Sequence, residues 1–255
     1  MNILEKIAAD TKERINAQKK RQPLEKVIEL AAKAAVDSVP FAFENALKGD
    51  DIAFICEVKK ASPSKGIISE DFPYLEIAKA YEAAGAAAIS VLTEPFHFKG
   101  SDSYLREIAD CVSVPLLRKD FTVDSYMIYE AKFLGASAVL LICSILDRET
   151  LKEYMEIARS IGLCALVETH DEAEVKTALD AGARIIGVNN RNLATFEVDI
   201  SLSERLRKMV PDDKIFVSES GIHSPEDVEY LRKIGADAVL IGEALMKGAR
   251  LSWLK

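Results

Sequence analysis

The sequence predicts an α/β protein in which strands and helices alternate along the chain and close into a (β/α)8 barrel. Eight short apolar runs of strand length recur along the 255 residues, with starts about 21 to 35 residues apart. That spacing leaves room for one helix and two loops after each strand. Continuous apolar strands separated by amphipathic segments are typical of a parallel sheet covered by helices. The runs are residues 52–56, 87–92, 114–117, 137–142, 163–167, 184–188, 214–217 and 237–241.

A weak internal repeat is the second observation, and it marks the ends of helices. Glycine stands at the start of GAAAISVL from residue 85, GASAVLLI from 135, GARIIGV from 182 and GADAVLIG from 235. Glycine fits the left-handed residue that ends a helix, so each repeat predicts a helix that stops and a strand that begins at once.

The helices between the strands are recognised by apolar residues at helical spacing. Segments 74–84, 124–134, 147–161, 171–181 and 225–234 show this spacing. We expect N-caps at Asp124, Asp147, Asp171 and Ser224, with Pro225 at the first helical position of the last segment. These strand–helix units predict a TIM barrel. An open doubly wound sheet is the alternative, and the absence of a GxGxxG turn after the first strand argues against it.

Residues 1–48 precede the first strand and are predicted to form a helical extension. Ile3, Leu4, Ile7 and Ile15 lie on one side of a first segment, and a second segment starts near Pro23. No stretch rich in glycine, proline or serine separates this extension from residues 49–255. We therefore expect residues 1–255 to form a single domain, with the extension packed on the barrel.

Composition and charge exclude several classes of protein. The net charge of −8 argues against nucleic acid or an anionic membrane as partner, since both reward clustered Lys and Arg. No apolar run approaches the ~18 residues of a membrane span. The start MNILEKIAADTKER lacks the features of a signal peptide, so a cytoplasmic location is expected. We take a monomer as the expected state.

Metal and cofactor sites are not expected. The four cysteines include no CxxC pair, and the three histidines include no HxxxH or HExxH spacing. Cys56, Cys143 and Cys164 lie in or beside apolar runs, so we expect buried thiols in a reducing compartment.

Charged side chains follow several of the apolar runs, where a barrel carries its reacting groups. Glu57 and Lys59 are two residues apart and point to the same side of a strand. Lys119 and Glu168 each stand two residues after a leucine of their own strand, which predicts the same inward direction. Lysines beside carboxylates in a desolvated site suit general acid–base catalysis. The alternative interpretation is a set of salt bridges at the barrel rim.

A phosphate site is predicted independently of these charges. Ser220 and Gly221 after the seventh strand, and Gly242 after the eighth, stand where barrels often bind phosphate through backbone N–H groups. The alternative is that the two glycines serve only tight turns. Glu243 would repel a phosphate, so we expect its side chain to point away from the anion.

Seven motifs together resemble the indole-3-glycerol phosphate synthase family. They are EVKKASPSKG (57–66), LTE with FKGS (92–94 and 98–101), LRKDF (117–121), VETH (167–170), GVNNRNL (187–193), SESGI (218–222) and IGEALM (241–246). The resemblance spans residues 50 to 246, and an N-terminal helical extension is also typical of the family. SESGI and GEALM are less specific, because other phosphate-binding barrels share them.

The resemblance implies a carbon–carbon carboxy-lyase of tryptophan biosynthesis that needs no cofactor. Such an enzyme converts 1-(2-carboxyphenylamino)-1-deoxyribulose 5-phosphate into indole-3-glycerol phosphate, carbon dioxide and water. Lys119 matches the general acid, Glu168 the base in dehydration, and Lys59 a lysine that contacts the substrate's anionic groups. Further matches are Glu57 and Asn189 as orienting partners, Phe98 as an aromatic wall, Arg191 as a brace, and Ser62, Ser220, Gly221, Gly242 and Glu243 as substrate or phosphate contacts.

The chain departs from the family pattern at two positions. Asn190 stands where many relatives have Ser or Thr, and Glu243 where many have Ser.

The segment SPSKGIIS (62–69) is expected to be a mobile loop that closes over substrate. A neighbouring barrel such as phosphoribosylanthranilate isomerase is the rival enzyme, although it should lack the Glu57/Lys59 pair and the lysine of LRKDF. A catalytically inactive barrel that serves as a binding protein is the rival from another class.

Overall fold

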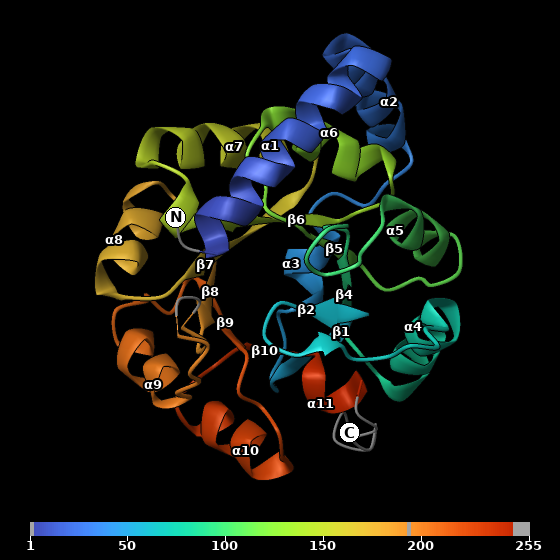
Figure 1. The fold of residues 1–255 in the computed structure, drawn as a ribbon. Helices are drawn as coiled ribbons and strands as arrows, with labels where there is room; N and C mark the ends of the chain where they lie inside the picture. The colour runs from blue at the N-terminus through green and yellow to red at the C-terminus, as the bar shows by residue number, and fades with distance from the viewer. Residues whose placement is uncertain (1–2, 193–194, 247–255) are drawn as a thin grey trace.

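The chain forms a closed barrel of eight parallel strands surrounded by helices (Figure 1). This computed structural model describes residues 3–192 and 195–246. Around the barrel the strands follow the order β1-β10-β9-β8-β7-β6-β5-β4, so each one has two neighbours. Closure excludes the open doubly wound sheet and confirms the predicted fold. The strands are β1 (Ala53–Val58), β4 (Ala88–Leu92), β5 (Leu116–Lys119), β6 (Ala138–Ile142), β7 (Cys164–Thr169), β8 (Ile185–Asn189), β9 (Ile215–Glu219) and β10 (Ala238–Ile241).

Helices cover the outside of the barrel, and the predicted capping residues begin four of them. The side chains of Asp124, Asp147, Asp171 and Ser224 each accept a backbone N–H from the first turn of the helix that follows. Gly85, Gly135, Gly182 and Gly235 have φ between 83° and 101°, the left-handed conformation expected at these helix ends. The helices are α4 (Tyr74–Ala84), α5 (Asp102–Ala109), α6 (Ser125–Phe133), α7 (Arg148–Ser160), α8 (Glu172–Asp180), α9 (Ser201–Arg207), α10 (Pro225–Lys233) and α11 (Glu243–Met246), with the 3-10 turn η1 (Cys143–Ile145) before α7.

Alternate residues of each strand belong to two different apolar cores. Ile55, Leu117, Leu166 and Val217 belong to the cluster that fills the barrel interior, whereas their sequence neighbours pack against the helices. This two-residue period matters for function, because a polar residue two positions beyond an interior residue also faces the barrel axis. As predicted, Cys56, Cys143 and Cys164 are buried thiols.

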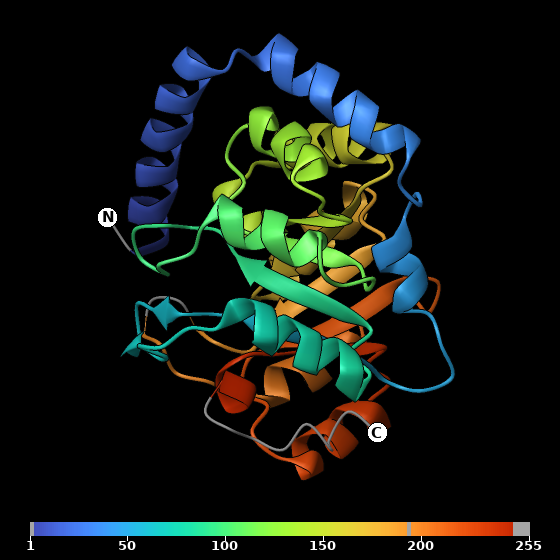
Figure 2. The ribbon, with the colours of Figure 1, turned by 90° about the vertical axis from the view of Figure 1, so that its right-hand side faces the viewer.

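The N-terminal extension wraps the barrel from one end to the other (Figure 2). It consists of α1 (Ile3–Arg21), α2 (Leu24–Val36) and α3 (Ala42–Ala46). Ile7 of α1 and Phe43 of α3 both pack against the interior core, and α2 packs along α6. The first and the last helix of the extension therefore contribute to the interior core, while α2 packs outside the barrel on α6. Residues 1–2, 193–194 and 247–255 of the predicted domain lie outside the described residues.

The segment predicted to be a mobile loop contains a small hairpin. Strands β2 (Ala61–Ser62) and β3 (Gly66–Ile67) pair antiparallel, because Lys65 N–H donates to the Ser62 carbonyl oxygen and closes a tight turn between them. Whether it closes over substrate stays a prediction. Within residues 3–192 and 195–246, no helix combines the length and the apolar character needed to cross a membrane.

Candidate active site

A cavity at the carboxyl ends of the barrel strands contains every residue singled out from the sequence as a site residue. Its walls also include Ile3, Leu4 and Ile7 of α1, so the extension forms part of the cavity. Residues from the ends of all eight barrel strands converge there, although 186 positions separate Glu57 from Glu243 in the chain. The predicted residues in its lining are Glu57, Lys59, Ser62, Phe98, Lys119, Glu168, Asn189, Arg191, Ser220, Gly221, Gly242 and Glu243.

Lys119 lies between two buried carboxylates at the centre of this cavity. Its Nζ donates to Oε2 of Glu168 at 2.8 Å and to Oε2 of Glu219 at 3.0 Å. The three side chains are 12%, 2% and 2% exposed, so the ion pairs are largely removed from water. One ammonium is therefore shared by two carboxylates, one from β7 and one from β9.

The pKa values of these three groups diverge for physical reasons. Burial alone would lower the pKa of Lys119, but the charges of Glu168 and Glu219 outweigh it and raise that pKa. Burial raises the pKa of Glu168, but Lys119 and His170 outweigh it and bring that pKa below its usual value. For Glu219 burial prevails over the attraction of Lys119, and the pKa rises to about 7. Two carboxyl groups that share a cation thus differ in protonation near neutral pH.

His170 forms the outer partner of Glu168. Its Nε2 lies 3.3 Å from Glu168 Oε1, and its Nδ1 lies 3.1 Å from Glu174 Oε2. Burial alone would lower the pKa of His170, but its contacts with these two carboxylates raise it to about 10. The imidazole is consequently a cation at neutral pH, held between a site carboxylate and a carboxylate of α8.

Glu57 and Lys59 face the same cavity, as their spacing predicts. Lys59 Nζ forms an ion pair with Glu57 Oε1, and the Glu57 side chain is 5% exposed. Gly242 at the end of β10 packs directly against that carboxylate: a Cβ added there would lie 2.5 Å from Glu57 Oε1 and 3.1 Å from Glu57 Cβ. Gly242 therefore leaves the space that the Glu57 side chain occupies.

The substitution Gly242→Ala is expected to push the Glu57 carboxylate away from Lys59 and to lower kcat/KM by at least tenfold. The physical reason is steric, because neither Glu57 Cβ nor the Gly242 backbone can move far inside a closed barrel. Steady-state kinetics check this, with Gly49→Ala as the control, where the nearest atom to an added Cβ is 3.8 Å away. Equal kcat/KM for the two variants would contradict the prediction.

Small residues and three charged side chains form the rim where a phosphate is predicted. Ser220 and Gly221 both have positive φ, 66° and 79°, so the chain turns sharply after β9 at a conformation that costs a serine energy. The Glu243 carboxylate contacts Arg191 Nη2 at 3.4 Å and Lys65 Nζ at 3.8 Å. The prediction that Glu243 turns away from a bound anion remains a prediction. Leu193, the last residue of the GVNNRNL motif, lies outside the described residues.

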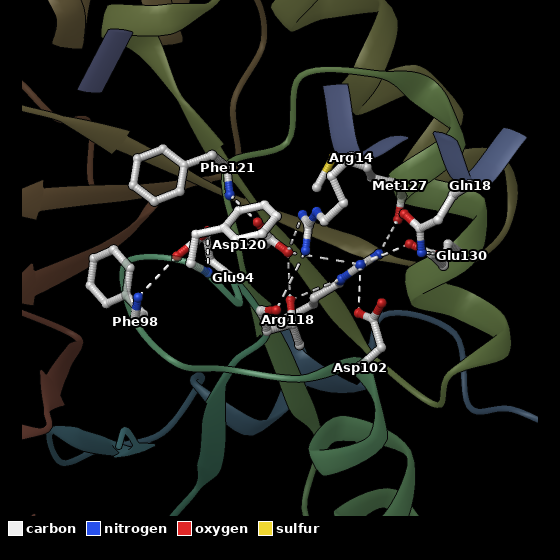
Figure 3. Close-up of polar contacts among 12 residues, drawn as sticks. Arg14, Gln18, Glu94, Phe98, Asp102, Arg118, Asp120, Phe121, Met127 and Glu130 are labelled. Atoms are coloured by element: carbon white, nitrogen blue, oxygen red, sulfur yellow. Dashed lines mark hydrogen bonds and ion pairs between the residues drawn. The ribbon is translucent and has the colours of Figure 1, made fainter. Parts of the chain in front are cut away.

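Phe98 is held by a buried carboxylate that the sequence analysis did not single out for this role. The Glu94 carboxylate accepts the backbone N–H groups of Phe96, His97 and Phe98 at 2.7 to 2.9 Å and so shapes the loop after β4 (Figure 3). Phe121 lies beside Phe98 with ring centroids 6.0 Å apart. Phe98 and Phe121 thus present two neighbouring rings to the cavity, and their role as an aromatic wall for the substrate stays a prediction.

The residues on either side of Lys119 belong to a buried polar network that reaches α1 of the extension. Arg118 Nη2 contacts Asp102 Oδ1 at 2.7 Å and Glu130 Oε2 at 2.8 Å. Asp120 Oδ2 accepts from Arg14 of α1 at 2.8 Å (Figure 3). Because Arg118 is 2% exposed, this network is buried, and it fixes the end of β5 from which Lys119 projects.

Three contributors to the site were missed by the sequence analysis. Glu219 had the same signal as Lys119 and Glu168, since it stands two residues after the interior residue Val217. His170 follows Glu168 by two positions and closes the VETH motif, but nothing in the sequence assigned it a role in the site. The α1 residues carried no signal, because nothing local indicates which part of the barrel the helix covers. Across the described residues there is no group of three or more His, Cys, Asp or Glu side chains placed to hold a metal ion.

The sequence profile that matches this chain and the two relatives described here carry the same family name. The sequence profile of indole-3-glycerol phosphate synthase matches residues 4–252. A protein of Ruminiclostridium cellulolyticum called indole-3-glycerol phosphate synthase is 60% identical over 99% of this chain and 98% of its own length. A protein of the same name from Endomicrobium trichonymphae is 54% identical over 98% of this chain and 96% of its own length.

The similarity to a more distant solved structure concerns the fold alone. A structure described as native KDPGal superposes with a TM-score of 0.56 and 13% identity, over 81% of this chain and 94% of that chain. At that identity the likeness supports the barrel architecture and carries no information about the reaction.

Proposed function

The chain belongs to the indole-3-glycerol phosphate synthase family, and we propose that the residues around its cavity carry out this family's reaction. The reaction joins a carbon of the anthranilate ring to the ketone of 1-(2-carboxyphenylamino)-1-deoxyribulose 5-phosphate. Loss of carbon dioxide and then of water gives indole-3-glycerol phosphate, a step of tryptophan biosynthesis. The chain is accordingly a carbon–carbon carboxy-lyase.

The observation that carries the proposed mechanism is the buried ammonium of Lys119 between Glu168 and Glu219. When the ring carbon attacks the ketone, negative charge develops on the carbonyl oxygen, and Lys119 protonates that oxygen. The iminium formed within the substrate then accepts the electron pair released as carbon dioxide leaves. In the final loss of water Glu168 removes a proton from carbon while the departing hydroxyl group takes a proton from the reprotonated Lys119, and Glu168 then passes its proton to Lys119.

The remaining cavity residues are proposed to hold the substrate. Lys59 contacts its anionic groups, while Glu57 and Asn189 orient its hydroxyl groups and the catalytic lysine. Phe98 packs against the anthranilate ring, and Ser62 faces the substrate from the β2–β3 hairpin. The phosphate binds near Ser220, Gly221 and Gly242, with Arg191 as brace and Glu243 at the rim. The described geometry favours neither the isomerase nor the inactive barrel.

A turnover assay tests this function together with the absence of a metal requirement. We expect the purified protein to form the fluorescent indole product at the same rate before and after treatment with EDTA, since lysine and glutamate supply the proton transfers. Substrate that binds but gives no product in untreated protein would contradict the function. Activity that disappears with EDTA and returns with a divalent cation would contradict the metal-free mechanism.

We also propose that the chain acts as a cytoplasmic monomer on a phosphorylated small molecule and binds neither nucleic acid nor membrane. All four cysteines are free, which suits a reducing compartment. Sedimentation equilibrium at micromolar concentration tests the monomer, and a mass of twice 28.1 kDa would contradict it.

A further inference from the structure

The two carboxylates that share Lys119 have unequal surroundings. Glu168 has a second partner, because its Oε1 lies 3.3 Å from His170 Nε2, an ion-pair contact that lies outside hydrogen-bond geometry. Glu219 Oε1 is buried and has no hydrogen-bond partner among the described residues. Each carboxylate gives its Oε2 to Lys119, so the difference between them arises at their other oxygens.

Glu174 holds His170 beside Glu168 through two contacts, which maintains the difference between Glu168 and Glu219. The Glu174 carboxylate at the start of α8 accepts the His170 backbone N–H at 2.8 Å and also lies 3.1 Å from the ring Nδ1. The imidazole side chain is 17% exposed. An imidazole that contacts one carboxylate with each nitrogen is stabilised as a cation, in which both nitrogens carry protons.

We propose that His170 is a positioning residue that keeps Glu168 ionised as the base and thereby leaves Glu219 as the carboxyl group that exchanges a proton with Lys119. The inference rests on the proposed function, which assigns the base to Glu168. The contact of His170 with Glu168 explains why two carboxylates at similar distances from the Lys119 ammonium have different tasks. Environments that separate the pKa values of two neighbouring acids commonly mark such a division.

The proton balance of the reaction gives Glu219 a task. Release of carbon dioxide from a carboxylate takes up one proton from water in each turnover. Lys119 gives its proton to the carbonyl oxygen and becomes a neutral amine. Protonated Glu219 returns a proton to Lys119 across the 3.0 Å contact, becomes a carboxylate, and regains a proton from solvent. Glu168 cannot serve this step, because it must remain unprotonated until the dehydration.

Other titratable groups surround the pair, and their positions do not remove the asymmetry. The Glu57 carboxylate of β1 raises the pKa of both Lys119 and Glu219. Cys143 of η1 stays a neutral thiol, because burial raises its pKa to about 12. Asp171 caps α8 with its carboxylate, which accepts from Glu174 N–H. The positive charges of Lys119 and His170 lower the pKa of Glu168, whereas Lys119 is the cation that lowers the pKa of Glu219.

Carboxyl titration in the folded protein tests the inference without any need for turnover. Protein labelled with ¹³C at the glutamate carboxyl carbons is titrated by NMR, and the Glu168 and Glu219 signals are identified by their loss in Glu168→Gln and Glu219→Gln. We expect the wild-type Glu219 signal to titrate near pH 7 and the Glu168 signal to stay that of a carboxylate at this pH. In His170→Gln the Glu168 midpoint should rise by about 1–3 units, the usual effect of a neighbouring charge. An unchanged Glu168 midpoint in that variant would overturn the proposal.

The pH profile of kcat/KM is the second readout, which a purely structural role would not move. His170→Gln should shift the acidic limb toward neutral pH, because a fraction of Glu168 becomes protonated and loses its function as base. Lys176→Gln is the matched control, since it removes one positive charge from an exposed position on α8, where Lys176 is 70% exposed. A uniform loss of activity in His170→Gln with an unmoved acidic limb would also overturn the proposal.

A second variant covers the case in which His170→Gln does not fold. Glu174→Gln weakens the hold on His170, and it should move the Glu168 midpoint in the same direction by a smaller amount. No movement in this variant would again contradict the proposal. If the wild type gives no indole product while the titration shows the expected asymmetry, the proposed function fails and the effect of His170 on the two carboxylates stands.

Discussion

The substitution Lys119→Ala is expected to lower kcat by about 10²–10⁴-fold, the usual contribution of a positioned acid. No other described ammonium contacts Glu168 or Glu219, since Lys59 pairs with Glu57. Loss of Lys119 also leaves two buried carboxylates facing each other without their shared cation, so one of them must take up a proton. The variant therefore loses the acid and weakens the base together.

Pre-steady-state kinetics and a binding measurement distinguish this loss from a loss of affinity. The dissociation constant of the substrate should change by less than about tenfold, because the phosphate and the anthranilate ring keep their proposed contacts. Lys79→Ala on the exposed face of α4 is the control and should retain the wild-type kcat. A Lys119→Ala variant with wild-type kcat would remove Lys119 from the role of acid.

Replacement of Arg118 by methionine should destabilise the protein by about 3–5 kcal/mol, the usual result of removing one partner of a buried ionic group. Arg118 contacts the carboxylates of Asp102 and Glu130, and it donates to the hydroxyl group of Thr93 and the backbone carbonyl of Met127. The Glu130 side chain is only 6% exposed, so water cannot replace the guanidinium there. An apolar side chain of similar length removes the charge with little change in volume.

Urea unfolding followed by circular dichroism measures this effect. Arg148→Met is the control, because Arg148 pairs with its neighbour Glu149 at the surface with 59% of its side chain exposed, and its unfolding midpoint should match that of the wild type. Arg118→Met/Glu130→Leu should recover part of the loss, since no unpaired carboxylate remains at Glu130. Equal unfolding midpoints for Arg118→Met and wild type would show that the buried network contributes nothing net.

The fold was predictable because its signals are local. Apolar runs such as 137–142 identify strands by composition, and β6 occupies Ala138–Ile142. Asp147 and Gly135 mark the start and the end of helices through backbone geometry that involves only a few neighbouring residues. The inward direction of Lys119 and Glu168 followed from the same local rule, the alternation of side chains along a strand.

The amino-acid sequence alone established the barrel, its strands and the chemical types of the groups at its mouth, because each depends on residues a few positions apart. Only the tertiary structure showed that Glu219 shares Lys119 with Glu168, and that Arg14 of α1 meets Asp120 across 106 positions. Those contacts depend on the closure of eight strands and on the packing of the extension, which bring distant segments within hydrogen-bond distance. Proximity of this kind also governs protonation, because burial and neighbouring charge, rather than residue type, set the pKa of Glu219 and of His170.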